Sequence, residues 1–330
     1  MSSCISPDLR HSICQNYNIE LNAATPIGTG AMSTTVKLNT AQGELFLKCY
    51  KSDALFSTNS VQRIAYTHAV HCFLWEQVLP VPRLLVNKAG ETYTMSGAQV
   101  YAVSEFVEGN SYDSTNPTEA LHYAGEMLGH LHQQLQGFGS SQFPIACEWS
   151  PMESEVFAQL RERLAGIRVA VADSENPPVS HDVIDGWLAE LETLENGLGA
   201  AVSSQWVIHG DYRAQNLKFD KGNRICAILD LDTARPADRL FDLGYALVFF
   251  PAVYQDTPLT ANQQAVFLSA YEKIMPLSAT EQKLLPLHLR VAFLRGLTLW
   301  LYLHFFAGMS ERTRPWIHGY LNSVEINTRF

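Results

Sequence analysis

The feature that most constrains the fold is a change of residue pattern near Glu108 and Gly109. Before this point, apolar and β-branched runs such as residues 33–38 alternate with turn segments such as residues 39–43, a pattern that predicts β-hairpins. After it, apolar residues recur at helical spacing, for example in residues 119–136. The chain is therefore expected to form an α+β fold, with a small β-rich lobe followed by a larger, mainly α-helical lobe.

The β-rich lobe is expected to contain two hairpins and one helix. The first hairpin continues into a strand at residues 45–50. Residues 61–78 form the expected helix, which ends at the Leu-Pro-Val-Pro segment because proline excludes a continued helix. The second hairpin is expected to pair residues 83–87 with residues 99–107.

Helices are expected through most of the second lobe. Residues 153–171 and 181–198 are amphipathic at helical spacing, and Ser278 with Glu281 forms a capping box that opens another helix. The C-terminal segment is rich in Trp, Tyr and Phe. Aromatic side chains at these spacings are expected to pack in a core, although a subset beside acidic residues would favour a cationic ligand through cation–π contact.

The composition excludes several classes of protein. With 330 residues, 47% hydrophobic and 17% charged, the chain can bury a core and is not disordered as a whole. Its net charge of −10 and the absence of a Lys/Arg run argue against nucleic-acid binding. The apolar stretch at residues 296–309 is too short for a membrane span and is expected to be a buried helix.

The cellular context follows from the cysteines and the first residues. The six cysteines show neither CxxC pairs nor metal-ligand spacing, which favours a reduced compartment. Residues 1–10 lack the charged-then-apolar pattern of a signal peptide. We therefore expect a cytoplasmic protein without a membrane or nucleic-acid partner, and the oligomeric state stays open.

The segment most informative about chemistry lies between residues 206 and 232, where apolar runs bracket a polar cluster. Phosphoryl transfer needs a carboxylate that orients or deprotonates the attacking hydroxyl, together with oxygen ligands for Mg²⁺ at the nucleotide phosphates. Asp211 can supply the first group. Asn216 and Asp230, which follow it in the chain, can supply the oxygen ligands.

These residues carry a resemblance to a known family. The motif HGDxxxxN followed by ILDLD resembles the aminoglycoside phosphotransferase and choline kinase group of the protein-kinase-like superfamily, to which kinase-like homoserine kinases also belong. It is formed by His209, Asp211, Asn216, Asp230 and Asp232. The later segment Arg239-Leu-Phe-Asp242 resembles the same group, and the resemblance covers nearly the whole chain in order.

The resemblance implies a protein-kinase-like bilobal fold. Residues 1–104 would form the nucleotide-binding N-lobe, residues 105–109 the hinge, and residues 110–330 the catalytic and substrate-binding C-lobe. It further implies an enzyme that uses ATP and Mg²⁺ to phosphorylate a hydroxyl group of a small molecule, such as an amino alcohol, a sugar-like compound or an aminoglycoside.

The nucleotide contacts that the resemblance implies lie in the first lobe. Gly28 and Gly30 flank a turn where backbone amides can approach phosphates, although a plain hairpin turn is the alternative. Lys48 resembles the superfamily lysine that contacts the nucleotide phosphates. Glu105 and Val107 resemble the hinge, whose backbone groups would bind adenine.

The catalytic roles are expected to divide among the motif residues. Asp211 orients the acceptor hydroxyl and accepts its proton, and Asn216 and Asp230 hold Mg²⁺. Arg213 either neutralises the transferred phosphoryl group or pairs with a surface carboxylate. His209 is expected to hold the loop by hydrogen bonding and not to take part in proton transfer.

The sequence departs from the superfamily at the helix residue that pairs with the strand lysine. Residues 61–78 contain one glutamate, Glu76, which lies late in the expected helix. Either Glu76 pairs with Lys48, or His68 or His71 replaces the glutamate. This departure leaves a nucleotide-binding pseudokinase-like module as an alternative. An atypical protein kinase is a further one, although Leu-Asp-Thr after Asp230 is no typical activation segment.

Overall fold

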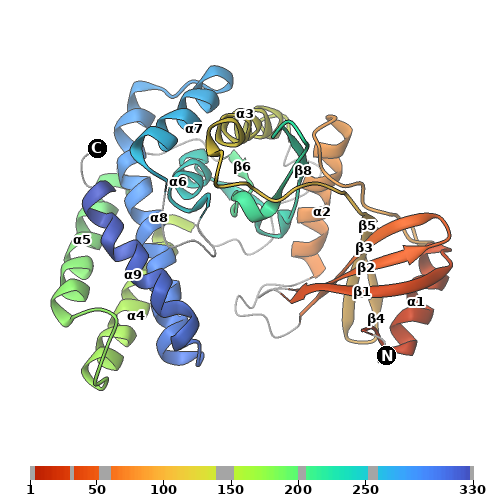
Figure 1. Cartoon of the computed structure of the whole chain (residues 1–330), viewed down its shortest axis with the longest axis horizontal. Helices are drawn as coiled ribbons and strands as arrows, with labels where there is room; N and C mark the ends of the chain where they lie inside the picture. The colour runs from red at the N-terminus through yellow and green to blue at the C-terminus, as the bar shows by residue number, and fades with distance from the viewer. Residues whose placement is uncertain are drawn as a thin grey trace. The chain divides into compact units, whose positions relative to one another are not determined.

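A computed structural model describes most of the chain and divides it into two compact units, shown in Figure 1. The described residues are 4–29, 33–51, 61–138, 152–199, 206–251 and 259–327. The N-terminal unit comprises Met1–Asn110, Phe138–Cys147 and Cys226–Thr233. The C-terminal unit comprises Ser111–Gly137, Glu148–Ile225 and Ala234–Phe330.

The N-terminal unit is built on a five-stranded antiparallel sheet with strand order β1-β2-β3-β5-β4. Its strands are β1 (Leu21–Thr29), β2 (Ser33–Thr40), β3 (Gly43–Tyr50), β4 (Thr94–Ser96) and β5 (Gln99–Glu105). Two helices accompany the sheet, α1 (Pro7–Tyr17) and α2 (Val61–Glu76). The predicted first hairpin and the predicted helix at residues 61–78 are present, with the helix ending at Glu76.

The second predicted hairpin is wrong in its first strand. The segment at residues 83–87 contributes a single bridge, from Leu84 to Ser104, and β4 pairs with β5 instead. Asn87 explains the departure of the chain from the sheet, because its side-chain oxygen accepts hydrogen bonds from two backbone N–H groups of the following turn. Gly97 then closes the tight turn between β4 and β5 with φ +60°, a conformation that glycine adopts without strain.

The core of the N-terminal unit lies between the sheet and α1. Strand β3 alternates, so that Leu45 and Leu47 are buried in this core while Lys48 lies on the opposite face. Helix α1, which the sequence analysis did not predict, contributes Ile13. It begins at a Ser6 N-cap, whose side chain accepts a hydrogen bond from the Leu9 backbone.

The C-terminal unit is mainly helical, as predicted. Its helices are α3 (Pro117–Leu135), α4 (Met152–Ala172), α5 (His181–Gly199), α6 (Arg239–Phe249), α7 (Ala261–Ile274), α8 (Ala279–Phe306) and α9 (Ser310–Asn327). Strands β6 (Trp206–Ile208) and β9 (Arg235–Ala237) pair antiparallel. The turn η1 (Ala214–Asn216) and β7 (Leu217–Phe219) follow β6. The next elements in the chain, β8 (Ile225–Ile228) and η2 (Leu231–Thr233), belong to the N-terminal unit except for Ile225.

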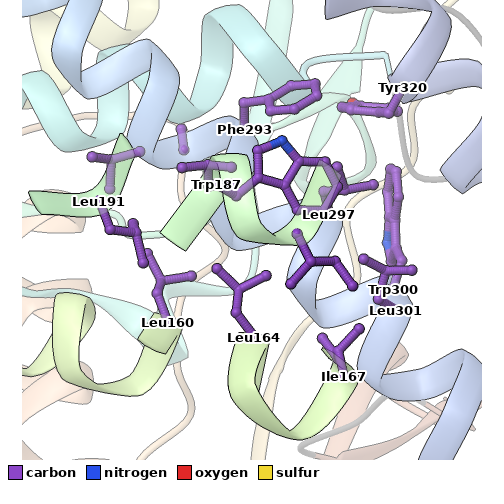
Figure 2. Close-up of a cluster of buried hydrophobic side chains, with 14 of the residues drawn as sticks. Leu160, Leu164, Ile167, Trp187, Leu191, Phe293, Leu297, Trp300, Leu301 and Tyr320 are labelled. Atoms are coloured by element: carbon purple, nitrogen blue, oxygen red, sulfur yellow. The ribbon is translucent and has the colours of Figure 1, made fainter. Parts of the chain in front are cut away.

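The main core of this unit is shared by α4, α5, α8 and α9, as Figure 2 shows. Trp187, Trp300 and Tyr320 belong to it, and the rings of Trp300 and Tyr320 meet edge to face at 4.5 Å between centroids. These aromatic residues pack in the core as expected, whereas Trp149 lies outside the described residues. Helix α8 is long and apolar enough to suggest a membrane span, but more than half of its apolar window is buried in this unit.

Close packing of α3 against α7 depends on two glycines. A Cβ atom at Gly125 would overlap the carbonyl group of Phe267, and one at Gly129 would lie 2.8 Å from Cβ of Ile274. Because neither glycine carries a side chain, the two helix backbones approach closely. This approach lets α3 and α7 share the hydrogen-bond network described below.

Candidate functional site

Lys48 is the centre of a charged cluster in the N-terminal unit. Its Nζ atom lies 2.6 Å from Oδ1 of Asp230 and 2.6 Å from Oδ2 of Asp232. The Lys48 side chain is only 14% exposed. Burial alone would lower the pKa of Lys48, but the two carboxylates raise it above its ordinary value, so the ammonium group stays charged. The structure thus brings Lys48 and Asp230 together, two residues that the sequence analysis had assigned to the nucleotide and the metal.

The two carboxylates of this cluster lie in different environments. Asp230 follows β8 with φ +60°, a left-handed conformation that aspartate tolerates better than most residues, and its side chain is 46% exposed. Asp232 is 14% exposed in η2. Burial raises the pKa of Asp232, as does the charge of Asp230, while Lys48 opposes that shift. Asp230 is therefore the accessible carboxylate, and Asp232 is the enclosed one.

The residue that pairs with Lys48 is neither Glu76 nor one of the two histidines considered from the sequence. Glu76 is the exposed last residue of α2. His68 hydrogen-bonds the Tyr50 hydroxyl at 2.8 Å, and His71 donates to the carbonyl of Pro82. Burial lowers the pKa of His68 to about 3 and that of His71 to about 4, so both rings are neutral near pH 7. In place of a helix glutamate, it is Asp232 that contacts Lys48 together with Asp230.

The structure offers no specific support for the two glycines predicted to approach phosphates. Gly28 lies in β1 opposite Thr35, and a Cβ atom there would meet Oγ1 of Thr35 at 3.7 Å, an ordinary contact. The position thus has no steric need for glycine. Gly30 lies outside the described residues.

The predicted hinge begins where β5 ends. The Glu105 N–H donates to the carbonyl of Arg83 at 2.9 Å, and its carboxylate pairs with the same arginine at 3.0 Å. Over the described part of the chain, the backbone N–H and carbonyl of Val107 make no hydrogen bond. Val107 therefore has backbone groups to offer a ligand, whereas the N–H of Glu105 is already used.

Asp211 is the centre of a second cluster, in the loop between β6 and β7 of the C-terminal unit. The Asn216 side-chain amide donates to Oδ2 of Asp211 at 2.8 Å and to its backbone carbonyl at 2.8 Å. The guanidinium group of Arg213 lies 3.1 Å from Oδ2. The Tyr245 hydroxyl, from α6, donates to Oδ1 at 2.7 Å. The structure thus brings together the three predicted residues of this loop and adds Tyr245, which fixes the other carboxylate oxygen.

Asp242 holds this loop from behind. It is fully buried and accepts hydrogen bonds from the backbone N–H groups of His209 and Gly210, each at 2.6 Å, and from Nε2 of His132 at 3.2 Å. Burial alone would raise the pKa of Asp242, but the contact with His132 and the other donors lower it overall. His209, in turn, accepts the N–H of Asp211 on Nδ1 at 3.3 Å, which agrees with its expected supporting role.

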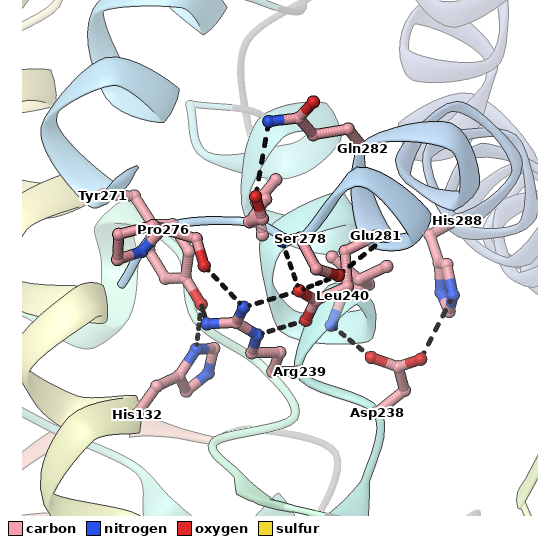
Figure 3. Close-up of polar contacts among 11 residues, drawn as sticks. His132, Asp238, Arg239, Leu240, Tyr271, Pro276, Ser278, Glu281, Gln282 and His288 are labelled. Atoms are coloured by element: carbon pink, nitrogen blue, oxygen red, sulfur yellow. Dashed lines mark hydrogen bonds and ion pairs between the residues drawn. The ribbon is translucent and has the colours of Figure 1, made fainter. Parts of the chain in front are cut away.

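A polar network extends from Asp242 to the start of α8, as Figure 3 shows in part. Nδ1 of His132 accepts from the Tyr271 hydroxyl at 2.9 Å, and that oxygen accepts from Arg239 at 3.4 Å. Arg239 also binds both carboxylate oxygens of Glu281, which closes the capping box of α8. Four helices therefore support the loop that carries Asp211, since the network links α3, α6, α7 and α8.

The role of Tyr245 was not predicted from the sequence. Its segment was noted only because Asp242 resembles a family residue. A helical spacing signal was available, because residues three apart on a helix lie on one face, and Asp242 supports the same loop that Tyr245 contacts. His132 and Tyr271 gave no such signal, since their partners lie far away in the sequence.

Comparison with known proteins identifies a family. Residues 23–277 match the phosphotransferase enzyme family. Among curated relatives, homoserine kinase of Methylobacillus glycogenes is 25% identical over 277 residues, which covers 83% of this chain and 77% of the relative.

Two solved structures show the same fold at low identity. Spectinomycin phosphotransferase, solved with ADP and spectinomycin, superposes with a TM-score of 0.64 at 13% identity and covers 99% of both chains. A microcompartment-associated aminopropanol kinase gives a TM-score of 0.64 at 14% identity over 98% of both chains. Together with the sheet and the helical unit, these similarities confirm the expected α+β, protein-kinase-like fold.

Proposed function

Because the chain belongs to the phosphotransferase enzyme family, we propose that it transfers a phosphoryl group from ATP, with Mg²⁺, to a hydroxyl group of a small molecule. The membership confirms the family resemblance seen in the sequence and the expectation of an enzyme of the small-molecule kinase type. The nucleotide, the metal ion, the acceptor and the role of each residue belong to the proposal.

The observation that supports the proposal most strongly is the geometry of the Asp211 carboxylate. Tyr245 and Asn216 bind one oxygen each, at 2.7 and 2.8 Å, and so hold the carboxylate in one orientation. A carboxylate held in this way can align an acceptor hydroxyl and take up its proton as the oxygen attacks phosphorus. Arg213, beside it, would offset the negative charge of the transferred group.

The side chains proposed to hold Mg²⁺ have the donor atoms that this ion prefers. Both hydrogen bonds from the Asn216 side-chain nitrogen go to Asp211, and its Oδ1 accepts no hydrogen bond from the described residues, so this oxygen is the atom left for a cation. Asp230 adds a carboxylate that is 46% exposed. Mg²⁺ bound by Asn216 and Asp230 would neutralise charge on the nucleotide phosphates.

The N-terminal unit supplies the proposed nucleotide contacts. Lys48 would bind phosphate oxygens, and the backbone of Val107 would bind the base. Glu105 remains a proposed hinge contact beside Val107, and Gly28 and Gly30 remain proposed backbone contacts of the phosphates. The ADP in the structure of spectinomycin phosphotransferase supports a nucleotide as the donor. We keep residues 1–104 as the proposed nucleotide lobe, residues 105–109 as the hinge and residues 110–330 as the catalytic lobe.

The acceptor is proposed from the relatives. The curated homoserine kinases make L-homoserine the first compound to test, followed by amino alcohols and aminoglycosides because of the solved structures. A cytoplasmic location without a membrane partner is kept as part of the same proposal.

The test is Asp211→Asn, with Asp173→Asn at an exposed position as a matched control. ATP consumption with each acceptor should fall by about 1,000-fold in Asp211→Asn, in keeping with the usual contribution of a general base. Binding of Mg-ATP should change less than threefold, and the control should behave as wild type. Unchanged turnover in Asp211→Asn would refute the role of this carboxylate.

Two other outcomes correspond to the alternative functions. If wild-type protein binds ATP but consumes none with any acceptor, the chain is a pseudokinase-like module. If it transfers labelled phosphate to polypeptides in place of small molecules, it is an atypical protein kinase. Each result is distinct from the expected one.

A further inference from the structure

Arg295 of α8 is a charged side chain in the C-terminal unit to which the proposed reaction assigns no role. Its guanidinium carbon lies 4.5 Å above the ring of Phe241, one helical turn before Tyr245 on α6. Burial lowers the pKa of Arg295 to about 10, while the nearby Tyr245 and Asp211 oppose this shift. The group therefore stays charged near pH 7 and lies close to the cluster around Asp211.

No carboxylate in the described residues forms an ion pair or hydrogen bond with Arg295. Asp211, which is near enough to affect its pKa, is already bound by Tyr245, Asn216 and Arg213. A partly buried cation without a bonded anion is costly, because it has lost part of its hydration without a charged partner in exchange.

Further positive charge lies close to Arg295. Arg163 of α4 is close enough to lower the pKa of Arg295. Arg213 lies 3.1 Å from Asp211. Arg295 is therefore close both to the ion pair of Arg213 with Asp211 and to a further arginine. Such a surrounding favours an anionic group and disfavours a cationic one.

We propose that the acceptor carries a carboxylate group and that Arg295 binds this carboxylate while the acceptor hydroxyl lies at Asp211. The inference rests on the proposed function and names its substrate class as hydroxy acids and hydroxy amino acids. Arg295 is thereby a specificity-determining residue. The cationic ligand that aromatic residues beside acidic ones would favour is not the one this cluster favours.

The planar guanidinium group suits this role. It offers N–H groups in a fixed fork that matches the two oxygens of a carboxylate. The contact with the Phe241 ring at 4.5 Å restricts the position of the group, so less freedom is lost when a ligand binds. The transferred phosphoryl group is the other anion that could meet an arginine here. Arg213, which contacts Asp211 directly, is better placed for that group.

The test compares pairs of acceptors that differ only by the carboxylate. L-Homoserine is paired with 3-amino-1-propanol, and L-threonine with 1-amino-2-propanol. The wild-type protein should favour the carboxylate member of at least one pair by about 100-fold in kcat/KM, the effect expected when a charged hydrogen-bonding partner is lost. Equal or better turnover of the amino alcohols would overturn the proposal.

Variants at Arg295 assign the preference to this side chain. Arg295→Met should raise KM for the carboxylate acceptor by about 100-fold, with less than threefold change for the amino alcohol and for ATP. Arg295→Lys, which keeps the charge but not the fork, should show a smaller loss. Arg312→Met is a matched control, because Arg312 stacks on Trp316 at 5.6 Å outside this cluster. An equal fall for both acceptors in Arg295→Met would show action on the phosphoryl group and refute carboxylate binding.

A binding assay separates this inference from the proposed function. Ligand-induced thermal stabilisation of the Asp211→Asn variant, measured with the same pairs, requires no turnover. The acceptors that carry a carboxylate should stabilise Asp211→Asn, and this stabilisation should be lost in the double variant Asp211→Asn/Arg295→Met. That result supports the role of Arg295 even if no acceptor is phosphorylated. Absence of ATP consumption alone would refute only the kinase function. Absence of a carboxylate preference in both assays would overturn the role of Arg295.

Discussion

Replacing Asp242 by asparagine should show how strongly the loop that carries Asp211 depends on one buried carboxylate. Asp242 is fully buried and accepts three hydrogen bonds, two from backbone N–H groups at 2.6 Å and one from Nε2 of His132 at 3.2 Å. Asparagine has nearly the same shape, so the change removes the charge and one acceptor without creating a cavity.

The cost can be worked out from these contacts. An asparagine oxygen at the position of Oδ2 keeps the bonds from His209 and His132, but the amide nitrogen then faces the N–H of Gly210. An unsatisfied buried donor costs about 1–3 kcal/mol, and each retained bond loses about 1 kcal/mol when its acceptor becomes neutral. The free energy of unfolding should therefore fall by about 3–5 kcal/mol.

Urea unfolding of wild type and variant, followed by tryptophan fluorescence and circular dichroism, measures this difference. Asp238→Asn is the matched control, because Asp238 is also buried at the start of α6 but caps a helix by accepting from Leu240 at 2.8 Å. Asparagine caps a helix nearly as well, and the other contact of Asp238, with Nε2 of His288, is long at 3.6 Å, so the control should lose less than about 1 kcal/mol. A loss of less than about 1 kcal/mol in Asp242→Asn would refute the view that this carboxylate organises the loop.

Two further predictions concern proton-dependent behaviour. Tyr245→Phe removes the hydroxyl that lies 2.7 Å from Oδ1 of Asp211 and stabilises the charged form of this carboxylate. The pH below which turnover is lost should therefore rise by about one unit in a pH–rate profile. An unchanged profile would contradict this contact. His71 has a pKa lowered by burial to about 4, so it stabilises the folded state above pH 6.5, and this contribution is lost as the pH falls from 6.5 towards 4. The matched variant is His71→Gln, which keeps a donor for the Pro82 carbonyl. The difference in unfolding free energy between wild type and this variant should shrink by about 2 kcal/mol over that range. A difference that is independent of pH would exclude a buried neutral ring.

The local parts of the fold and of the site could be predicted from the sequence. Asp211 and Asn216 lie in one short loop, so their separation of five residues nearly determines that their side chains meet. The capping box of Ser278 and Glu281 is present as predicted, since both hydrogen bonds join residues three apart. In each case the information lies within one or two turns of the chain.

The parts that depend on distant residues could not be predicted in the same way. Asp232 reaches Lys48 across more than 180 residues, and no local pattern indicates that it takes a place beside this lysine. The first strand of the second hairpin was misplaced because residues 83–87 have strand-like composition, while the competing turn at Asn87 uses side-chain hydrogen bonds that periodicity does not reveal. The hydrogen bonds of this turn are local, but they come from a side chain, and they decided between two acceptable strand pairings.

The charge proposed for the acceptor illustrates why overall composition is a poor guide to a site. The net charge of −10 is compatible with a cationic or a neutral substrate, yet Arg213 pairs with Asp211, and Arg295 and Arg163 are close to one another in the same unit. At physiological ionic strength, charges separated by more than about 8 Å in solvent are largely screened, whereas partly buried charges a few ångströms apart interact strongly. A carboxylate bound at Arg295 would therefore be affected by these arginines far more than by the acidic surface. The nearest buried charges, and not the sum over the chain, should decide which acceptor is bound.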